Sequence, residues 1–387
     1  MQYFSKAVRF FSHVRSNRGI GAQERKRSVL IGDGLWEADV YAPVPGLFRL
    51  PKTILLVHGM AAIGNKDPRM AALALALARC GYIVIAPFFK DISGFEIRHQ
   101  TVADIVRVIE AVTRDSELCP DGRLSIFAPS FSAGMSLIAA ARPQVAHYVN
   151  AVCVVGSYCR VEPAIAGLLA RQDDDDYGRL IVLKNFLPFC NGFNKQVDDA
   201  LYAAILDNGL ERENPEFPRH LDRLPATEKG EIQRLLNDPA YRIDWWRTLS
   251  ARSSDVREMC RRLSVLPRLD GLRAPVAILH GAGDRVIPCE ESVALHRHLQ
   301  TLRVSTRLSV TRLLSHGDIL GGLSLVWDVA GVLRTLAFFF KHSERACHKS
   351  ETTENAFSPA FGDVSIPSEV CRPARISTAG PAGPGDK

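Results

Sequence analysis

The sequence lacks the short motifs that hold metals and nucleotides. It contains no C-x-x-C pair and no cysteine or histidine spacing typical of a metal site. No G-x-G-x-x-G follows a predicted strand, and the phosphate-binding motif G-x-x-x-x-G-K-[ST] is absent. These absences predict a protein that works without a metal or a nucleotide cofactor.

The cysteines lack the pattern of a disulfide framework. Their number is odd, and several lie inside apolar segments. Such a set is typical of reduced thiols, so we expect a cytoplasmic protein. The nine positions are Cys80, Cys119, Cys153, Cys159, Cys190, Cys260, Cys289, Cys347 and Cys371.

No uninterrupted apolar run is long enough to cross a membrane. The longest candidate, Leu323 to Phe340, contains Asp328 and Arg334, which indicates a helix docked on the body rather than a transmembrane span. The basic N-terminal segment 1–27 has no acid before Glu24 and lacks the apolar core of a secretory signal. We expect a helix packed on the body, with a peripheral membrane contact through residues 1–18 or organelle targeting as open alternatives.

Charge and composition are ordinary for a soluble globular protein. The 387 residues carry a net charge of +6, and the arginines are spread along the chain, which argues against nucleic acid as a partner. The segment 343–387 is rich in Ser, Thr, Pro, Gly and Ala and has few large apolar residues. We expect this C-terminal tail to be disordered.

Strands and helices alternate through the first part of the chain. Apolar runs at 53–57, 82–87, 123–128 and 148–156 predict buried strands, with helices expected between them at 68–80, 101–114 and 135–141. An earlier pair of strands, 29–31 and 35–41, is expected to be antiparallel, the second strand being a half-exposed edge. The pattern predicts an α/β fold, with a mostly parallel central sheet and helices on both faces.

The character of the sequence changes after residue 160. From there to about residue 272 polar and apolar residues recur at helical spacing, with no convincing strand, so we expect a helical insertion. Strands return at 275–280 and 306–314, a helix is expected at 290–302, and the docked helix at 323–340 closes the body. The core is therefore divided into 28–159 and 273–342.

A possible nucleophile follows the third of the buried strands. The stretch from Arg123 to Gly134 passes from an apolar run through small residues into a helix, an arrangement that lifts one serine above the end of a sheet. Ser130 stands two residues beyond Ala128, where the apolar run ends, and is the preferred nucleophile. Ser132 remains the alternative, because a window centred on it recovers one glycine of the G-x-S-x-G pattern.

Three residue types needed for nucleophilic acyl transfer each follow a predicted strand. They are Ser130, Asp284 and His316, and their order along the chain is nucleophile, acid, base. Because the carboxyl ends of parallel strands meet at one edge of a sheet, we expect these three side chains to lie together.

The chain resembles the α/β-hydrolases at four places, over about 28–159 and 273–342. The most specific is the strand that runs into H-G-x-x-D-x-x-x-P, because this is a common form of the acid segment in that family. The four places are His58-Gly59, the turn around Ser130, the segment His280 to Pro288, and Ser315-His316-Gly317.

The resemblance implies an α/β-hydrolase fold in which the insertion 160–272 is a helical cap. It implies an oxyanion hole formed by the backbone N–H of Phe131 and by that of Met60 or Ala61. The family pattern has glycine where this chain has Ala128 and Ser132.

Together these features predict a serine hydrolase acting on a small-molecule carboxylic ester or thioester without a cofactor. Ser130 would form the acyl-enzyme, His316 would act as base and Asp284 would orient His316. A non-catalytic binding protein of the same fold, an acyltransferase and a peptidase remain alternatives. Trp245 and Trp246 either line the substrate pocket or pack the cap.

Overall fold

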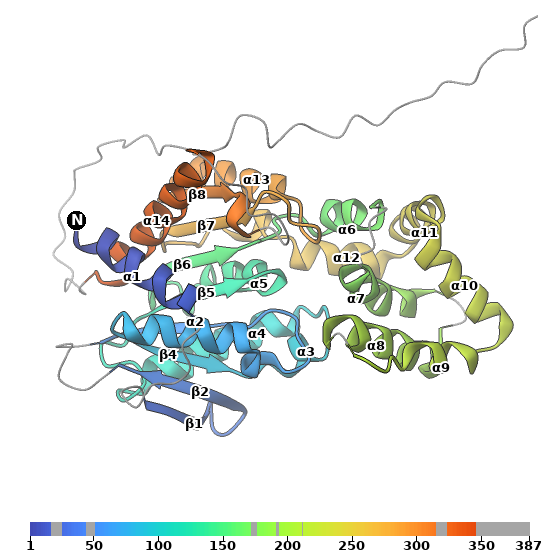
Figure 1. The fold of residues 1–387 in the computed structure, drawn as a ribbon, viewed down its shortest axis with the longest axis horizontal. Helices are drawn as coiled ribbons and strands as arrows, with labels where there is room; N and C mark the ends of the chain where they lie inside the picture. Colours follow the sequence, from blue (N-terminus) through green and yellow to red (C-terminus); the bar gives the residue numbers. More distant parts are fainter. Residues whose placement is uncertain are drawn as a thin grey trace, which may run out of the picture.

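The structure is a computed structural model of the chain. It describes residues 1–16, 25–43, 51–171, 176–190, 193–210, 212–314 and 323–345. The described residues form one α/β body with a group of helices at one end (Figure 1).

The body is built on an eight-stranded sheet with the order β1-β2-β4-β3-β5-β6-β7-β8. Strand β2 runs antiparallel to both of its neighbours, and the strands from β4 to β8 run parallel to one another. The strands are β1 (Arg25–Ile31), β2 (Trp36–Ala42), β3 (Lys52–Leu56), β4 (Tyr82–Pro87), β5 (Leu124–Pro129), β6 (Val149–Val155), β7 (Val276–Gly281) and β8 (Thr306–Thr311).

Helices cover both faces of the sheet, because its central strands are apolar on both sides. In β3, Leu55 packs with the helices of one face, and Ile54 and Leu56 pack with those of the other. The first face carries α4 (Gln100–Arg114), α5 (Phe131–Ala140) and α13 (Cys289–Thr301), and the second carries α1 (Gln2–Ser16), α2 (Pro68–Arg79) and α14 (Leu323–Ser343).

Local signals set the ends of α2 as the sequence predicts. The carboxylate of Asp67 accepts a hydrogen bond from the backbone N–H of Arg69, Pro68 occupies the first helical position, and Gly81 follows the helix with φ of 96°. A short helix, α3 (Lys90–Ser93), was not predicted. At the other end of the body, β8 stops at Thr311, three residues earlier than expected, and continues as a 3-10 turn.

The prediction that the second strand is a half-exposed edge is wrong. Strand β1 forms the edge, and β2 is buried from Ala38 to Tyr41. The polar residue in this run, Asp39, is only 1% exposed; it accepts a hydrogen bond from Ser28 Oγ and lies 3.1 Å from Lys26 Nζ. Partners on the neighbouring strand therefore allow a carboxylate to be buried where alternation alone indicates exposure.

The N-terminal helix packs on the body, beside α14 and α2. It buries Ala7 and Phe10, and Lys6 forms an ion pair with Glu344 at the far end of α14. Phe4 and Val8 are exposed instead.

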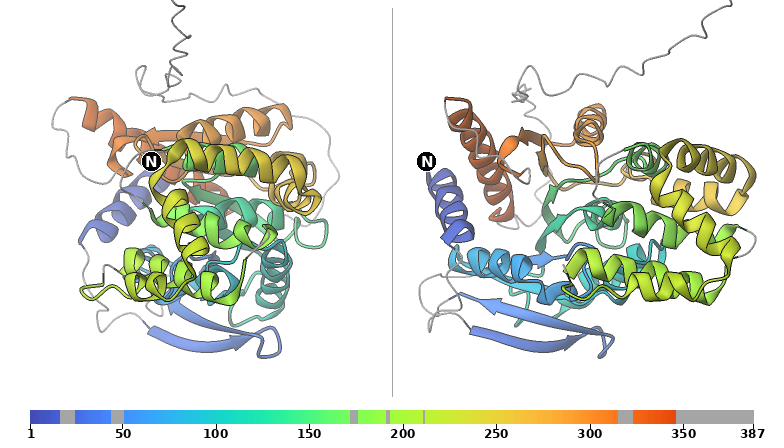
Figure 2. Two further views of the ribbon diagram at one scale, coloured as in Figure 1. Left: turned by 90° about the vertical axis from the view of Figure 1, so that its right-hand side faces the viewer. Right: turned by 45° about the vertical axis from the view of Figure 1, so that its right-hand side comes forward.

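The insertion between β6 and β7 is helical, as expected. Its helices lie together beyond one end of the sheet, and the views in Figure 2 agree with that placement. They are α6 (Val161–Leu169), α7 (Tyr177–Phe186), α8 (Lys195–Leu210), α9 (Phe217–Asp222), α10 (Ala226–Asn237), α11 (Pro239–Arg252) and α12 (Ser254–Leu263). The predicted mostly parallel sheet, with helices on both faces and a helical insertion, is confirmed.

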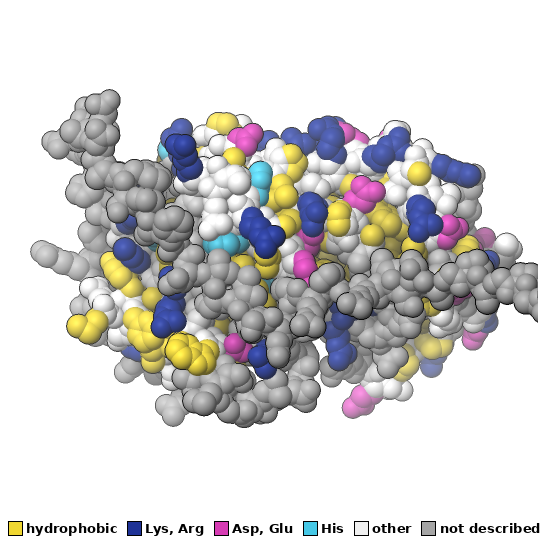
Figure 3. Space-filling model, turned by 90° about the horizontal axis from the view of Figure 1, so that it is seen from above, with side chains coloured by type: hydrophobic (Ala, Val, Ile, Leu, Met, Phe, Trp, Pro, Cys, Tyr) yellow, Lys and Arg dark blue, Asp and Glu magenta, His cyan; other side chains and the backbone are white. Residues whose placement is uncertain are grey.

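Among the described residues, no helix is both long and apolar enough to cross a membrane. On the side that carries α13 and α14, the described Lys and Arg side chains are scattered among apolar and acidic ones (Figure 3). Beyond Arg345, the predicted C-terminal tail lies outside the described residues.

Candidate functional site

Ser130 occupies a strained turn between β5 and α5. Its backbone has φ of 58° and ψ of −140°, close to a region that glycine alone populates freely. The backbone N–H of Ser130 donates to the carbonyl of Val155 over 2.7 Å, which fixes the turn to the end of β6. The side chain is half-buried and makes no capping hydrogen bond to α5, so the hydroxyl is not used by the helix.

Ser132, by contrast, is fully buried in the first turn of α5. Its hydroxyl donates to the carbonyl of Pro129 over 2.7 Å. Gly134 of the same motif serves packing: a Cβ there would lie 2.5 Å from the ring of Tyr158. The glycine recovered by centring the motif on Ser132 is therefore explained by the close approach of an aromatic ring.

The loop after β3 lies against the turn at Ser130. A Cβ at Gly59 would stand 3.8 Å from Cβ of Ser130. His58 is fully buried, and its Nε2 accepts the backbone N–H of Phe89 over 3.0 Å, which leaves Nδ1 to donate to the carbonyl of Gly59. Burial lowers the pKa of His58 to about 4, so this imidazole is neutral near pH 7 and holds the loop in place.

Two tyrosines that the sequence analysis missed support the turn and the loop. The ring of Tyr158 stacks on Phe131 at 4.6 Å, and its hydroxyl donates to the carbonyl of Leu263. The hydroxyl of Tyr177 donates to the carbonyl of Met60 over 2.7 Å, and burial raises its pKa to about 12. Tyr158 stands three residues after β6, a position at the carboxyl edge of the sheet that could have drawn attention; Tyr177 carries no comparable signal.

Asp284 lies at the same edge, in the turn after β7. Its Oδ1 accepts the backbone N–H groups of Val286 and Ile287 at 2.9 and 3.0 Å. Its Oδ2 faces the end of β6, because a Cβ at Gly156 would lie 3.2 Å away from it. Since Ser130 bonds to the residue before Gly156, the structure brings the serine and the acid to either side of the end of one strand.

A buried histidine, His280, contacts the turn after β7 that contains Asp284, which we call the acid turn. Nε2 of His280 lies 2.9 Å from the carbonyl of Ile287 and 3.6 Å from Oδ2 of Asp284, and Nδ1 lies 2.6 Å from the hydroxyl of Ser292. Burial lowers the pKa of His280, which favours the neutral ring with its proton on Nε2. His280 thereby ties β7, the acid turn and α13 together.

His316 lies outside the described residues, as do Ser315 and Gly317. The last described residue before them is Leu314, and it lies beside the acid turn. A Cβ at Gly281 would stand 3.2 Å from the carbonyl oxygen of Leu314. The described chain therefore stops, before residues 315–322, close to the carboxyl end of β7.

An apolar pocket of about 110 Å³ opens beside Ser130. Helices α6 and α7 of the insertion form one wall, and the acid turn forms another. Such lining suits an apolar group better than a charged one. The lining residues are Met60, Ile97, Ser130, Phe131, Tyr158, Val161, Ala164, Ile165, Leu168, Tyr177, Gly178, Ile181, Val182, Val286 and Ile287.

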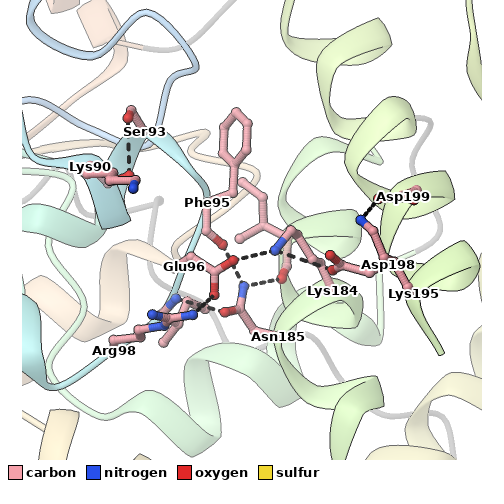
Figure 4. A network of polar contacts seen from close by, with 12 residues as sticks. Lys90, Ser93, Phe95, Glu96, Arg98, Lys184, Asn185, Lys195, Asp198 and Asp199 are labelled. Carbon is pink, nitrogen blue, oxygen red and sulfur yellow. Dashed lines mark hydrogen bonds and ion pairs between the residues drawn. The ribbon is translucent and has the colours of Figure 1, made fainter. Parts of the chain in front are cut away.

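A polar network holds the insertion to the core near this pocket (Figure 4). Lys184 of α7 is buried and bonds to Glu96 at 2.5 Å and to Asp198 of α8 at 3.4 Å. The neighbouring Asn185 donates to the carbonyl of Phe95 and accepts the N–H of Ile97. The loop that contributes Ile97 to the pocket is therefore fixed to α7 on both sides.

The two adjacent tryptophans lie away from the pocket. Trp246 is 4% exposed and meets Phe186 edge-on at 5.0 Å, and Trp245 is partly buried beside it. Both pack the interior of the insertion. Across the part of the chain that the structure describes, no group of three or more His, Cys, Asp or Glu side chains is arranged to hold a metal ion.

We compared the chain with known protein families, sequences and structures. No family model matches the chain, and no curated protein matches it in sequence. A puromycin-hydrolyzing peptidase from Mycobacterium tuberculosis is similar in structure, with a TM-score of 0.50 and 15% identity over 84% of this chain and 40% of that one.

Two further structures are more distant. An acylaminoacyl peptidase from Pyrococcus horikoshii has a TM-score of 0.47 and 14% identity over 87% of this chain and 44% of that one. An esterase/lipase from an uncultured bacterium has a TM-score of 0.43 and 11% identity over 88% and 92%. The chain spans less than half the length of the two peptidases. The order and direction of the strands, together with the likeness to the mycobacterial structure, show that this chain has the α/β-hydrolase fold.

Proposed function

We propose that the chain is a serine hydrolase that cleaves a carboxylic ester or thioester through an acyl-enzyme on Ser130. The observation that carries this proposal is the backbone of Ser130, whose φ of 58° and ψ of −140° put a serine in a conformation that costs about 1–3 kcal/mol. Strain of this kind persists where the surrounding structure maintains it, and it clusters at functional sites.

The choice of Ser130 over Ser132 is supported by what each hydroxyl does. Ser132 is buried, and its hydroxyl donates a hydrogen bond to the carbonyl of Pro129. Ser130, in contrast, lines the pocket. A nucleophile must reach both its base and the substrate carbonyl. Ser130 alone of the two meets the second condition.

His316 is the proposed base and Asp284 the residue that orients it. Oδ1 of Asp284 accepts hydrogen bonds from two backbone N–H groups, so Oδ2 is available to accept a hydrogen bond from the imidazole N–H of His316. His316 stands two positions after Leu314 in the sequence, so their Cα atoms lie at most about 7 Å apart. Since Leu314 lies beside the acid turn, this reach supports the pairing of His316 with Asp284.

The oxyanion would be held by backbone donors on both sides of Ser130. Phe131 is the first residue of α5, so its N–H has no intrahelical partner and lies at the positive end of the helix. The second donor is the N–H of Met60 or Ala61, in the loop whose glycine lies against Ser130. The bond from Tyr177 to the Met60 carbonyl fixes this loop from the insertion side.

In the reaction, His316 takes the proton of Ser130 as its oxygen attacks the acyl carbon. The tetrahedral anion collapses to the acyl-enzyme, and the leaving alcohol or thiol receives the proton from His316. Water then attacks the acyl-enzyme with His316 again acting as base, which releases the acid and restores Ser130.

The pocket supports an apolar acyl group of modest size. Its volume of about 110 Å³ and its aliphatic walls suit a short acyl chain, and the walls from α6 and α7 assign selectivity to the insertion. We propose that residues 160–272 act as the cap that selects the substrate.

A fluorophosphonate probe followed by mass spectrometry tests the proposal. Labelling of the peptide that contains Ser130, lost in Ser130→Ala and kept in Ser132→Ala, is the expected result. Absence of labelling in the wild-type chain would favour a non-catalytic binding protein. Turnover of p-nitrophenyl esters of graded chain length, compared with p-nitroanilides of the same acyl groups, separates an esterase from a peptidase.

A further inference from the structure

A second cavity, of about 310 Å³, lies at the junction of the core and the insertion. Its walls come from the start of α4, the end of α5, helix α12 and the 3-10 turn η3 (Leu266–Arg268). Four of its seven lining residues are arginines. The full lining is His99, Val102, Arg142, Glu258, Arg261, Arg262 and Arg268.

This cavity is separate from the pocket at Ser130. Helix α5 begins at Phe131, beside Ser130, and has ten residues. At 1.5 Å per residue, its two ends lie about 15 Å apart. Arg142 follows the far end, so a ligand held here does not occupy the acyl pocket.

The arginines exceed the acids that face them. Glu258 is the single acid of the lining; it bonds to Arg261 through both of its oxygens and to Arg262 at 2.6 Å. These contacts lower the pKa of Glu258 to about 2, so it stays ionised. With four arginines and one glutamate, the lining carries a charge of 4 − 1 = +3 when His99 is neutral.

Two of the arginines are not paired with an acid in the described part of the chain. Among the residues that the structure describes, neither Arg142 nor Arg268 forms an ion pair. They come from segments in firm contact, because a Cβ at Gly271 would lie only 2.3 Å from the carbonyl oxygen of Ala141. The two guanidinium groups are therefore carried by a fixed backbone on one wall of the cavity.

The start of helix α4 also lines the cavity. His99 precedes α4 and makes no capping hydrogen bond with its side chain, and Val102 in the first turn also lines the cavity. The N-terminal end of this 15-residue helix attracts anions through the partial positive charge of the helix dipole. A contact of 3.3 Å from Arg262 to Nε2 of His99 joins this wall to α12.

From these observations we propose that the cavity binds a small, soluble, phosphate-bearing molecule. Guanidinium forks match the paired oxygens of a phosphate group, and the positive charge of the cavity favours a ligand with more than one negative charge. The volume is at the small end of the range for ligand pockets, which suits a compact polyanion. Such a ligand would contact the core through Arg142 and the insertion through α12, and so link the two.

Calorimetric titration of inorganic pyrophosphate into the full-length chain tests the proposal. The Ser130→Ala variant serves as background, so that the result does not depend on hydrolysis. The double variant Arg142→Ala/Arg268→Ala is expected to weaken pyrophosphate binding at least tenfold. Arg142→Lys/Arg268→Lys, which keeps the charge and loses the fork, is expected to lie between this variant and the parent.

The matched control is Arg107→Ala/Arg247→Ala, which removes the same charge from exposed arginines of α4 and α11 outside the cavity. Its affinity for pyrophosphate is expected to stay within threefold of the parent. Equal losses in the two alanine pairs, or no binding of pyrophosphate by the parent at millimolar concentration, would overturn the proposal. Citrate binding as tight as that of pyrophosphate would refute the assignment to phosphate.

Discussion

The strained backbone of Ser130 leads to a prediction about stability: the proposed nucleophile lowers the stability of the fold. A serine at φ of 58° and ψ of −140° costs about 1–3 kcal/mol, and alanine at the same position keeps this cost. Glycine relieves the strain but loses about 0.5–1 kcal/mol through the freedom of the unfolded chain. Ser130→Gly should therefore be more stable than Ser130→Ala, by up to about 2.5 kcal/mol.

Urea denaturation of the two variants, compared by their midpoints and slopes, measures this difference. Both variants should lose about 10⁴-fold or more in turnover of a p-nitrophenyl ester, because both lack the proposed nucleophilic hydroxyl. Comparing glycine with alanine, rather than with serine, removes the effect of the lost hydroxyl from the result.

The neighbouring serine provides a control of opposite sign. Ser132 lies within α5, where glycine is less favourable than alanine by about 0.5–1 kcal/mol. Ser132→Gly should therefore be less stable than Ser132→Ala, and both should retain most of the activity. If glycine also proved the less stable choice at Ser130, the argument from backbone strain would be refuted.

Three other substitutions test separate parts of the site. Asp284→Asn should lower turnover by about 10⁴-fold while the urea midpoint changes little, since the backbone bonds to Oδ1 can persist; near-normal turnover would remove Asp284 from the mechanism. Gly134→Ala should destabilise the fold by about 1–3 kcal/mol, because its Cβ would lie 2.5 Å from the Tyr158 ring, and in a double-mutant cycle Tyr158→Leu should reduce that loss. His58 has a folded pKa of about 4 against about 6.5 unfolded, so stability should be complete above pH 6.5 and fall by roughly 3 kcal/mol as the pH drops to 4. His58→Gln should flatten this part of the profile in urea titrations across pH, and an unchanged slope would contradict the assignment.

The strands and helices of the core could be predicted because their signals are local. Asp67, Pro68 and Gly81 act on residues next to them, and the buried strands are apolar on both faces. The burial of Asp39 could not be predicted in the same way. It depends on Lys26 and Ser28 of the paired strand, and a periodic pattern within one strand carries no information about its neighbour.

The residues of the candidate site likewise fall into those that local sequence predicts and those that depend on contacts between distant segments. Ser130 and Asp284 could be located from the strand ends that precede them, and the sheet brings their turns to one edge. The contacts of Tyr158 and Tyr177 join residues 105 and 117 positions apart, so no local pattern indicates them. The walls of the pocket were missed for the same reason, because α6 and α7 acquire their role only where they pack over Ser130.

The departures from the G-x-S-x-G pattern do not argue for a lost activity. Helix α5 packs against β5 here and both positions are fully buried, which favours small residues. Ala128 fits with no exposed surface, and Ser132 adds a hydroxyl whose one proton goes to the carbonyl of Pro129. Pro129 has no N–H to leave unpaired at the end of the strand, and the following N–H, that of Ser130, bonds to Val155. Both replacements are therefore compatible with the turn. At position 130 itself glycine would relieve the backbone strain, so the presence of a strained serine there favours a role for its hydroxyl.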